Sequence, residues 1–129
     1  MKEPRWVPSL AVEVVHLDQI REHGGFPGLR DRGALESALA RPRNRWTYDS
    51  TADLAALASA YGYALARSHP FSDGNKRVAF LVVVVFLELN GHTLNVSEDV
   101  VVGTILSLAA GDLGEDEFAH WLRAHITRR

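Results

Sequence analysis

The sequence has no cysteine among its 129 residues, so disulfide bonds and thiolate chemistry are excluded. This absence fits a reducing compartment, and we expect a cytoplasmic protein. We also expect no export signal, because MKEPRWVPSL carries an acid and prolines where a secretory signal has a continuous apolar region. The longest apolar run, Val78–Leu87, is well short of the roughly 20 residues that cross a bilayer. We therefore expect no membrane segment and assign this run to the protein interior.

An excess of positive charge is absent too. The formal net charge is -2, whereas general nucleic-acid binders are usually basic, so we expect no direct nucleic-acid partner. The composition, 47% apolar and 23% charged, is that of an ordered globular protein. Because no repeat or linker interrupts the chain, residues 1–129 are predicted to form a single domain.

Apolar periodicity predicts six helices, and hence an all-α fold: a compact six-helix bundle around a buried central helix. The expected segments cover roughly residues 8–23, 31–41, 54–68, 74–89, 95–108 and 115–126. The fourth is ambiguous, since its four consecutive valines favour a strand. Its length exceeds a usual strand, which favours a central helix that is hydrophobic all round.

Three finer expectations concern particular segments. In the first helix, Leu10, Val14 and Leu17 are spaced to share one face, which predicts a core-facing stripe. The second helix is expected to stop at Arg41–Pro42, and RNRWTYD after it is expected to be a loop or short hairpin. In the fifth, Asn95 and Glu98 have the spacing of a capping box.

The densest polar cluster is HPFSDGNKR, residues 69–77, directly before the most apolar segment. A helix that begins at Gly74 or Asn75 has free N–H groups and partial positive charge at that end, which attract anions. Gly74 allows a ligand to approach the backbone. Lys76 and Arg77 add two cations where the helix dipole disfavours them, which indicates an anion of higher charge, such as a polyphosphate.

Other residues of the cluster suit a reaction centre. Asp73 suits Mg²⁺, which takes one or two carboxylates together with phosphate oxygens and water. His69 titrates near neutral pH and is suited to take a proton from a hydroxyl. Phe71 is expected to point into the core as an anchor. Taken singly, Asp73 is also a common helix N-cap, and the other charged side chains are also compatible with a solvated loop.

HPFSDGNKR resembles the motif of the Fic/Doc superfamily, and in particular its Doc (death-on-curing) branch. The wider Fic pattern is H-P-F-x-x-G-N-G-R-x-x-R, from which Lys76 and Phe80 depart, replacing the second glycine and the last arginine. Both departures match the Doc pattern H-x-F-x-[DN]-[AG]-N-K-R. GGFPGLRDRGALESAL, residues 24–39, is similar to the region that joins the first helices of Doc toxins, and the six-helix prediction suits the family over nearly the whole chain.

The resemblance implies an activity and a set of roles. Doc proteins are toxins of type II toxin–antitoxin pairs, which transfer the γ-phosphate of ATP to a threonine of elongation factor Tu and so halt translation. It implies His69, Lys76 and Arg77 as catalytic residues and Asp73 as the Mg²⁺ ligand. Gly74 and Asn75, with the same two cations, would bind the phosphates of ATP. A cognate antitoxin is the implied regulator.

Alternatives stay open at this point. An AMP-transferring Fic enzyme is the nearest one, although Lys76 in place of glycine and the loss of the second arginine favour phosphate transfer. A non-catalytic module that binds a partner's phosphate or carboxylate is the other.

Trp46 and Tyr48 are further candidates. In this superfamily the region that corresponds to them forms a flap over the target peptide, although the two aromatics would equally pin a loop to the core.

Two further groups of residues lie outside the motif. The cations Arg41, Arg43 and Arg45 suit a solvated stretch or the docking of an acidic antitoxin tail. The other histidines lack the i, i+4 spacing of a helical zinc pair, so we expect no zinc site. These histidines are His16, His23, His92, His120 and His125.

Overall fold

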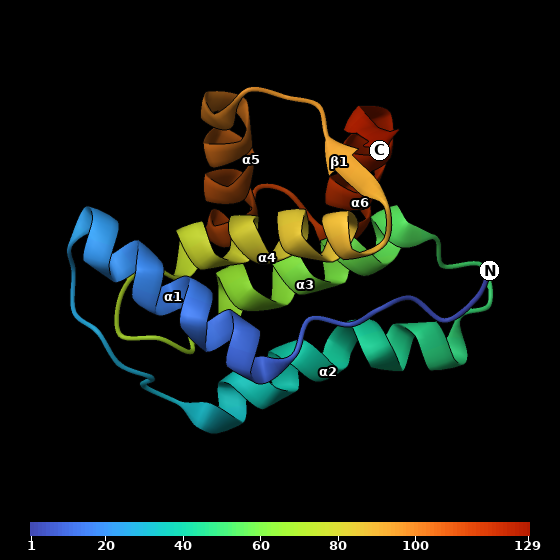
Figure 1. Cartoon of the computed structure of the whole chain (residues 1–129). Coiled ribbons are helices and arrows are strands. Elements are labelled where there is room, and N and C mark those ends of the chain that lie inside the picture. Colours follow the sequence, from blue (N-terminus) through green and yellow to red (C-terminus); the bar gives the residue numbers. More distant parts are fainter.

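The computed structural model describes residues 1–129 and contains six helices and one small sheet (Figure 1). The helices are α1 (Ser9–His23), α2 (Arg32–Tyr48), α3 (Leu54–Ser68), α4 (Asn75–Leu89), α5 (Glu98–Ala110) and α6 (Glu115–His125). The strands β1 (His92–Leu94) and β2 (Ile126–Arg128) pair antiparallel, with Thr93 opposite Thr127. The predicted all-α, six-helix fold is confirmed. No helix is both long enough and apolar enough to cross a membrane.

Local signals place several helix ends where the sequence predicts them. The carboxylate of Asp31 accepts a hydrogen bond from Ala34 N at 3.0 Å and caps α2. Asp53 caps α3 in the same way, through Ala56 N at 2.9 Å. Gly24 follows α1 in a positive-φ conformation that favours glycine. These boundaries depend on contacts within a few residues, which is why the pattern alone locates them.

The prediction that α2 stops at Arg41–Pro42 is wrong, because the helix continues through Pro42 to Tyr48. Proline removes one backbone hydrogen bond, but Pro42 is buried and α2 packs along α3 over its length (Figure 1). Arg41 and Arg45 both bind the carboxylate of Glu115 in α6, at 2.7 and 3.1 Å. Tertiary packing and these ion pairs therefore outweigh the local break. The expected loop or hairpin over residues 43–49 is helical up to Tyr48.

α3 is the most thoroughly buried helix, and it contacts α2, α4, α5 and α6. Small residues allow neighbours to approach it from several sides: a Cβ on Gly62 would lie 2.7 Å from Phe118 Cε2 and 3.0 Å from Val83 Cγ2. The sequence predicts that α4 is the buried central helix, yet α4 buries one face and leaves Leu89 40% exposed. The centre of the bundle is therefore α3, with α4 packed against it.

The predicted core stripe of α1 faces solvent. Leu10, Val14 and Leu17 are 72%, 51% and 40% exposed. The two buried side chains of α1 are Val12 and His16 on the opposite face. The prediction from spacing is therefore wrong about which face of α1 is buried.

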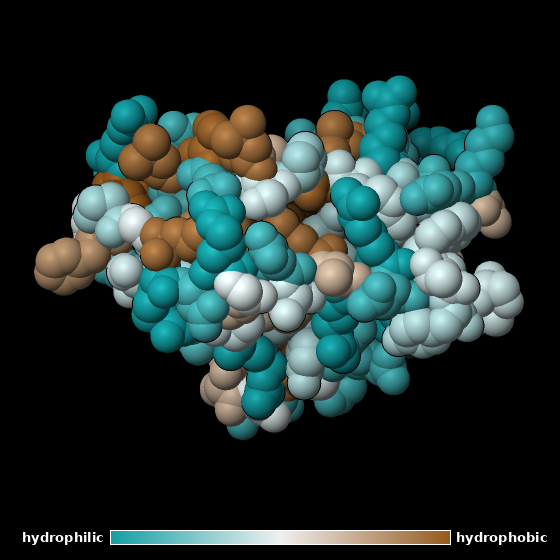
Figure 2. Space-filling view, turned by 90° about the horizontal axis from the view of Figure 1, so that it is seen from below, coloured by the Kyte–Doolittle hydropathy of each residue, from teal (hydrophilic) through white to brown (hydrophobic).

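The surface of the molecule is mixed. Figure 2 shows it from below, with apolar residues gathered at upper left and hydrophilic residues over much of the rest.

The predicted capping box of α5 is also wrong. The N-cap of α5 is Ser97, and no side chain caps this helix. Asn95 instead donates its backbone N–H to His125 O at 2.8 Å, next to the β1–β2 pair. The two strands are three residues each, too short for a periodic pattern to announce them.

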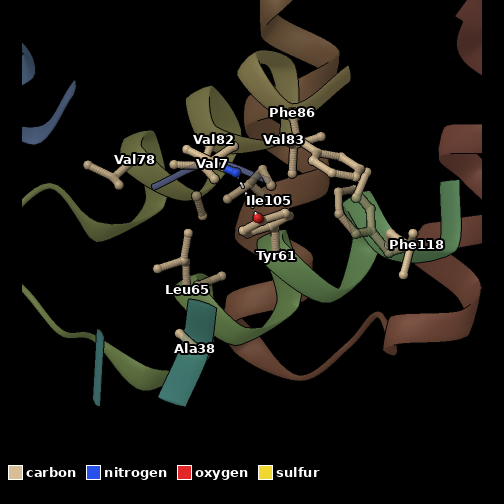
Figure 3. Close-up of a cluster of buried hydrophobic side chains, with 14 of the residues drawn as sticks. Val7, Ala38, Tyr61, Leu65, Val78, Val82, Val83, Phe86, Ile105 and Phe118 are labelled. Carbon is tan, nitrogen blue, oxygen red and sulfur yellow. Dashed lines mark hydrogen bonds between the residues drawn. The ribbon is translucent and has the colours of Figure 1, made fainter. Parts of the chain in front are cut away.

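The centre of the core contains one buried hydroxyl with a partner far away in sequence (Figure 3). Tyr61 is fully buried, and its hydroxyl accepts a hydrogen bond from Val7 N at 3.0 Å. Burial raises the pKa of Tyr61, so this phenol stays neutral across the physiological range. The bond ties the segment before α1 to α3.

Replacing Tyr61 by Phe removes this acceptor and leaves the buried N–H of Val7 without a partner. We expect the free energy of unfolding to fall by about 1–3 kcal/mol, measured by urea denaturation. Tyr63→Phe is the matched control, because its hydroxyl is partly exposed and makes no hydrogen bond to the protein. Equal losses in both variants would contradict the role of the Val7 bond.

A second prediction concerns acid stability. Hydrogen bonds from Arg123, at 2.7 and 3.0 Å, hold the pKa of Asp53 below its usual value of 3.8. The stabilisation is present above the unfolded pKa and disappears as pH falls through the folded one. Asp53→Asn keeps an N-cap but loses the charge. We expect the free energy of unfolding of wild type to exceed that of the variant by about 0.5–1 kcal/mol at pH 7, because the pair is half-exposed, and this gap to close as pH falls through the lowered pKa. Unfolding measured across pH tests this.

Candidate functional site

The motif HPFSDGNKR forms the turn between α3 and α4 and the first turn of α4. His69 ends α3 with φ 49° and ψ 57°, the left-handed conformation that turns the chain out of the helix. Arg30 binds the carbonyl oxygen of His69 through Nε, at 3.1 Å, and through Nη2. Arg30 N also donates to Pro70 O at 2.9 Å. The carbonyl groups of His69 and Pro70 are therefore both held by Arg30, while the side chain of His69 is exposed.

Phe71 anchors the turn to the core, as expected from the sequence. Its side chain is 2% exposed and stacks on the ring of His16, with centroids 3.9 Å apart and an 11° angle between the planes. Its backbone forms a bridge with Leu29, in the loop between α1 and α2. One buried ring thus fixes the middle of an otherwise polar segment.

The side chain of Asn75 closes the turn onto itself. Its Oδ1 accepts from Phe71 N at 2.9 Å, and its Nδ2 donates to Phe71 O at 3.0 Å. The amide therefore holds the shape of the turn, which leaves the backbone N–H of Asn75 as the group available to a phosphate.

The start of α4 is open. Its N-cap is Gly74 with φ 77°, no side chain caps it, and its first backbone bond runs from Val78 N to Gly74 O. The N–H groups of Asn75, Lys76 and Arg77 consequently have no protein partner. Lys76 and Arg77 are exposed, and neither is paired with a carboxylate. Free donors, the helix dipole and two unpaired cations coincide at this end.

Asp73 lies at the edge of this open end. Its Oδ1 accepts from Gly74 N at 2.9 Å and its Oδ2 from Phe26 N at 3.3 Å. It is not the N-cap, since Gly74 occupies that position. Each carboxylate oxygen retains free lone pairs, and the side chain is exposed. No group of three or more His, Asp and Glu side chains could hold a metal by itself. A cation here would combine Asp73 with oxygens from a ligand.

A hollow of about 300 Å³ collects the predicted residues in one place. Its lining consists of His69, Ser72, Asp73, Gly74, Asn75, Lys76 and Arg77. A second hollow of about 450 Å³ adjoins it through Lys76 and Arg77, and its wall includes Phe80, Leu81, Val102, Ile105 and Leu106. Lys76 therefore stands between a polar hollow and a more apolar one.

Trp46 and Tyr48 are not part of this assembly. The turn lies beside the beginning of α2, where Asp31 N donates to Pro70 O at 3.0 Å. Trp46 lies 14 residues beyond Arg32, the first residue of α2, which is about 21 Å at 1.5 Å per residue. Trp46 packs against the core, and Tyr48 is 76% exposed. The structure does not bring these two predicted residues to the hollow.

The loop of residues 24–31 lies beside the turn instead. Besides the Leu29 bridge and the contacts of Phe26 and Arg30, Gly28 O accepts from Ser72 N at 3.2 Å. A Cβ on Gly25 would lie 2.7 Å from Asp73 Oδ2, so this approach requires glycine. Sequence reasoning missed these contacts. The clustered glycines at positions 24, 25 and 28 are the signal that pointed to a tight backbone there.

The Fic/DOC family matches residues 6–87, a stretch that contains the whole turn and both segments packed on it, and the chain belongs to this family. Protein kinase doc of Escherichia phage P1 is 33% identical over 109 residues, 84% of this chain and 86% of the relative. Toxin Doc of Mycolicibacterium smegmatis is 40% identical over 78 residues, 60% of each chain. The resemblance to the Doc branch is thereby confirmed.

The geometry predicts that Asn75 is required for the shape of the turn. Asn75→Ala removes both bonds to Phe71, and we expect it to lower the free energy of unfolding by about 1–2 kcal/mol. Amide exchange at Phe71, measured by NMR, should accelerate more than exchange in α3. Ser72→Ala is the control in the same turn, because its hydroxyl is exposed and forms no hydrogen bond to the protein. Unchanged exchange at Phe71 in Asn75→Ala would refute the role.

Proposed function

We propose that the protein is the toxin of a type II toxin–antitoxin pair and acts as a protein kinase. In this proposal it transfers the γ-phosphate of ATP to a hydroxyl of a translation elongation factor. A threonine of elongation factor Tu is the proposed acceptor, which requires a cytoplasmic location. Residues 1–129 would act as one domain. The observation that carries the proposal is that an exposed histidine, two unpaired cations and three free backbone donors line a single hollow.

The residues at the hollow fit a magnesium–nucleotide complex. The free N–H groups at the start of α4 suit phosphate oxygens, and Gly74 supplies the φ of 77° that residues with a side chain rarely adopt. Lys76 and Arg77 balance the charge of a polyphosphate. Asp73 would hold Mg²⁺ together with phosphate oxygens, and the ion would neutralise charge on the phosphates when bound.

His69 is the proposed acceptor of the proton that the target hydroxyl releases. The hydroxyl oxygen of the target forms a bond to the γ-phosphorus, while the bond between that phosphorus and the bridging oxygen to the β-phosphate breaks. His69 takes the hydroxyl proton, and ADP leaves with the bond electrons. Lys76, Arg77 and the N–H groups of α4 stabilise the charge on the transferring group, and such electrostatic stabilisation is usually the main way in which a protein accelerates phosphoryl transfer.

Two side chains favour phosphate transfer over AMP transfer. Lys76 stands where AMP-transferring relatives have glycine, so it occupies space near the backbone and adds a charge. Phe80 replaces a second arginine, and it is half-buried in the wall of the 450 Å³ hollow. The first turns of α4 therefore carry one arginine, Arg77, where the AMP-transferring pattern has two.

A cognate antitoxin is the proposed regulator. Leu10, Val14 and Leu17 form an exposed apolar stripe on α1, and the half-exposed Val102 and Leu106 of α5 border the 450 Å³ hollow. Isolated exposed apolar residues need no explanation, but aligned ones on a helix suit a partner helix.

The cations of α2 support an acidic antitoxin tail less than the sequence suggests. Arg41 and Arg45 bind Glu115, and Arg43 lies over the Trp6 ring, so all three have protein partners already. A tail that docked on them would have to compete with these contacts.

Labelled ATP tests the type of transfer. We expect protein incubated with a bacterial lysate to label an acceptor of the size of elongation factor Tu from γ-labelled ATP only. Label from α-labelled ATP would instead identify AMP transfer and overturn the kinase proposal. Acid hydrolysis of the labelled acceptor should release phosphothreonine.

Substitution of the histidine tests catalysis against mere binding. His69→Ala should lower the transfer rate by a factor of about 10²–10⁴ and abolish growth arrest, with the fold preserved by circular dichroism. His120→Ala is the control, since His120 is exposed on α6 and does not line the hollow. If His69→Ala still arrests growth, the protein acts as a non-catalytic binding module.

A further inference from the structure

His16 is a buried histidine outside the motif. It comes from α1 and is 3% exposed, and with Val12 it is one of the two side chains that α1 buries. A buried imidazole loses its hydration, and this costs free energy unless a protein group takes the place of the water as hydrogen-bond partner. The partner here is the carbonyl oxygen of Asp73, 2.8 Å from Nε2. The histidine therefore directs its polar atom at the functional turn.

The contacts of His16 reach three parts of that turn. Its ring stacks on Phe71, 3.9 Å between centroids, and its Nε2 binds the backbone of Asp73. Its Cδ2 and Nε2 lie 3.8 and 3.9 Å from where a Cβ of Gly74 would stand. Because a carbonyl oxygen only accepts, Nε2 carries the proton, which fixes the tautomer of the ring.

The hydrogen bond to Asp73 O has a consequence for the anion site. The carbonyl of Asp73 and the N–H of Gly74 belong to one rigid peptide plane, so holding the oxygen also sets the direction of the N–H. The bond keeps the oxygen turned toward α1, away from the free N–H groups at the start of α4. A carbonyl turned the other way would present partial negative charge to a bound phosphate.

We propose that His16 is a positioning residue for the phosphate-binding turn, acting through its hydrogen bond to Asp73 O and its stacking on Phe71. It touches neither nucleotide nor target. A leucine would fill the same space without the cost of burying an imidazole, which argues against a purely packing role. The effect on catalysis rests on the proposed kinase function, whereas the effect on the turn does not.

Three variants separate the contacts. His16→Phe keeps a flat ring against Phe71 and removes the donor. His16→Gln keeps an N–H at similar reach and removes the ring. Val12→Ala is the control, because it removes core volume from the same face of α1 and leaves the hydrogen bond and the ring of His16 in place.

The first measurement is amide exchange by NMR, without nucleotide, at Ser72 and Gly74 relative to a core amide of α3. We expect about tenfold faster exchange in His16→Phe, the factor that loss of one hydrogen bond produces, and less than about threefold in His16→Gln. Val12→Ala should be less stable overall, with the relative exchange of the turn unchanged. Wild-type exchange in His16→Phe, or equal acceleration in Val12→Ala, overturns the proposal.

The second measurement is steady-state transfer with ATP and Mg²⁺. We expect His16→Phe to raise the KM for ATP about tenfold with a smaller change in kcat, and His16→Gln and Val12→Ala to stay within about threefold of wild type. A role in stability alone would leave KM of the folded protein unchanged in all three. If wild type transfers no phosphate, the kinase proposal fails, while the exchange rates still decide the role of His16.

Discussion

The burial of Phe71 is the contact on which the whole site depends. A single aromatic ring in the middle of a polar turn lies in the core, with α1 on one side and the loop of residues 24–31 on the other. Asn75 then binds both backbone groups of the same residue. The groups on either side, His69 before it and the start of α4 after it, are thereby presented outward. A rigid mount under a polar hollow is what positioning chemistry requires.

Much of this arrangement could be predicted from the sequence, because it is local. The site residues lie within nine positions, so any turn that buries Phe71 brings His69 and the start of α4 together. Asp31 and Asp53 cap helices through bonds that span three residues. The long apolar segment of α4 is correctly predicted as a helix, since its length excludes a strand. Such features need no knowledge of how distant segments pack.

The remaining features depend on partners far along the chain. α2 passes through Pro42 because Glu115, which is distant in sequence, binds the arginines on either side of it. Apolar spacing selects one face of α1, yet the buried positions are Val12 and a histidine, whose partner is Asp73. Analogy places Trp46 and Tyr48 at the site, but the length of α2 carries them away from it. In each case the deciding contact has no trace in the neighbouring sequence.

The attachment of the chain ends has a practical consequence for labelling. Asn90 binds both backbone groups of Arg5, and Arg129 N donates to Gly91 O, so both ends are tied at the C-terminal end of α4. Figure 1 shows both termini on the same side of the molecule, opposite the start of α4. The 15 residues of α4 separate them from the hollow by about 22 Å. Either terminus is a suitable point for a fluorophore or a surface tether that leaves the hollow open.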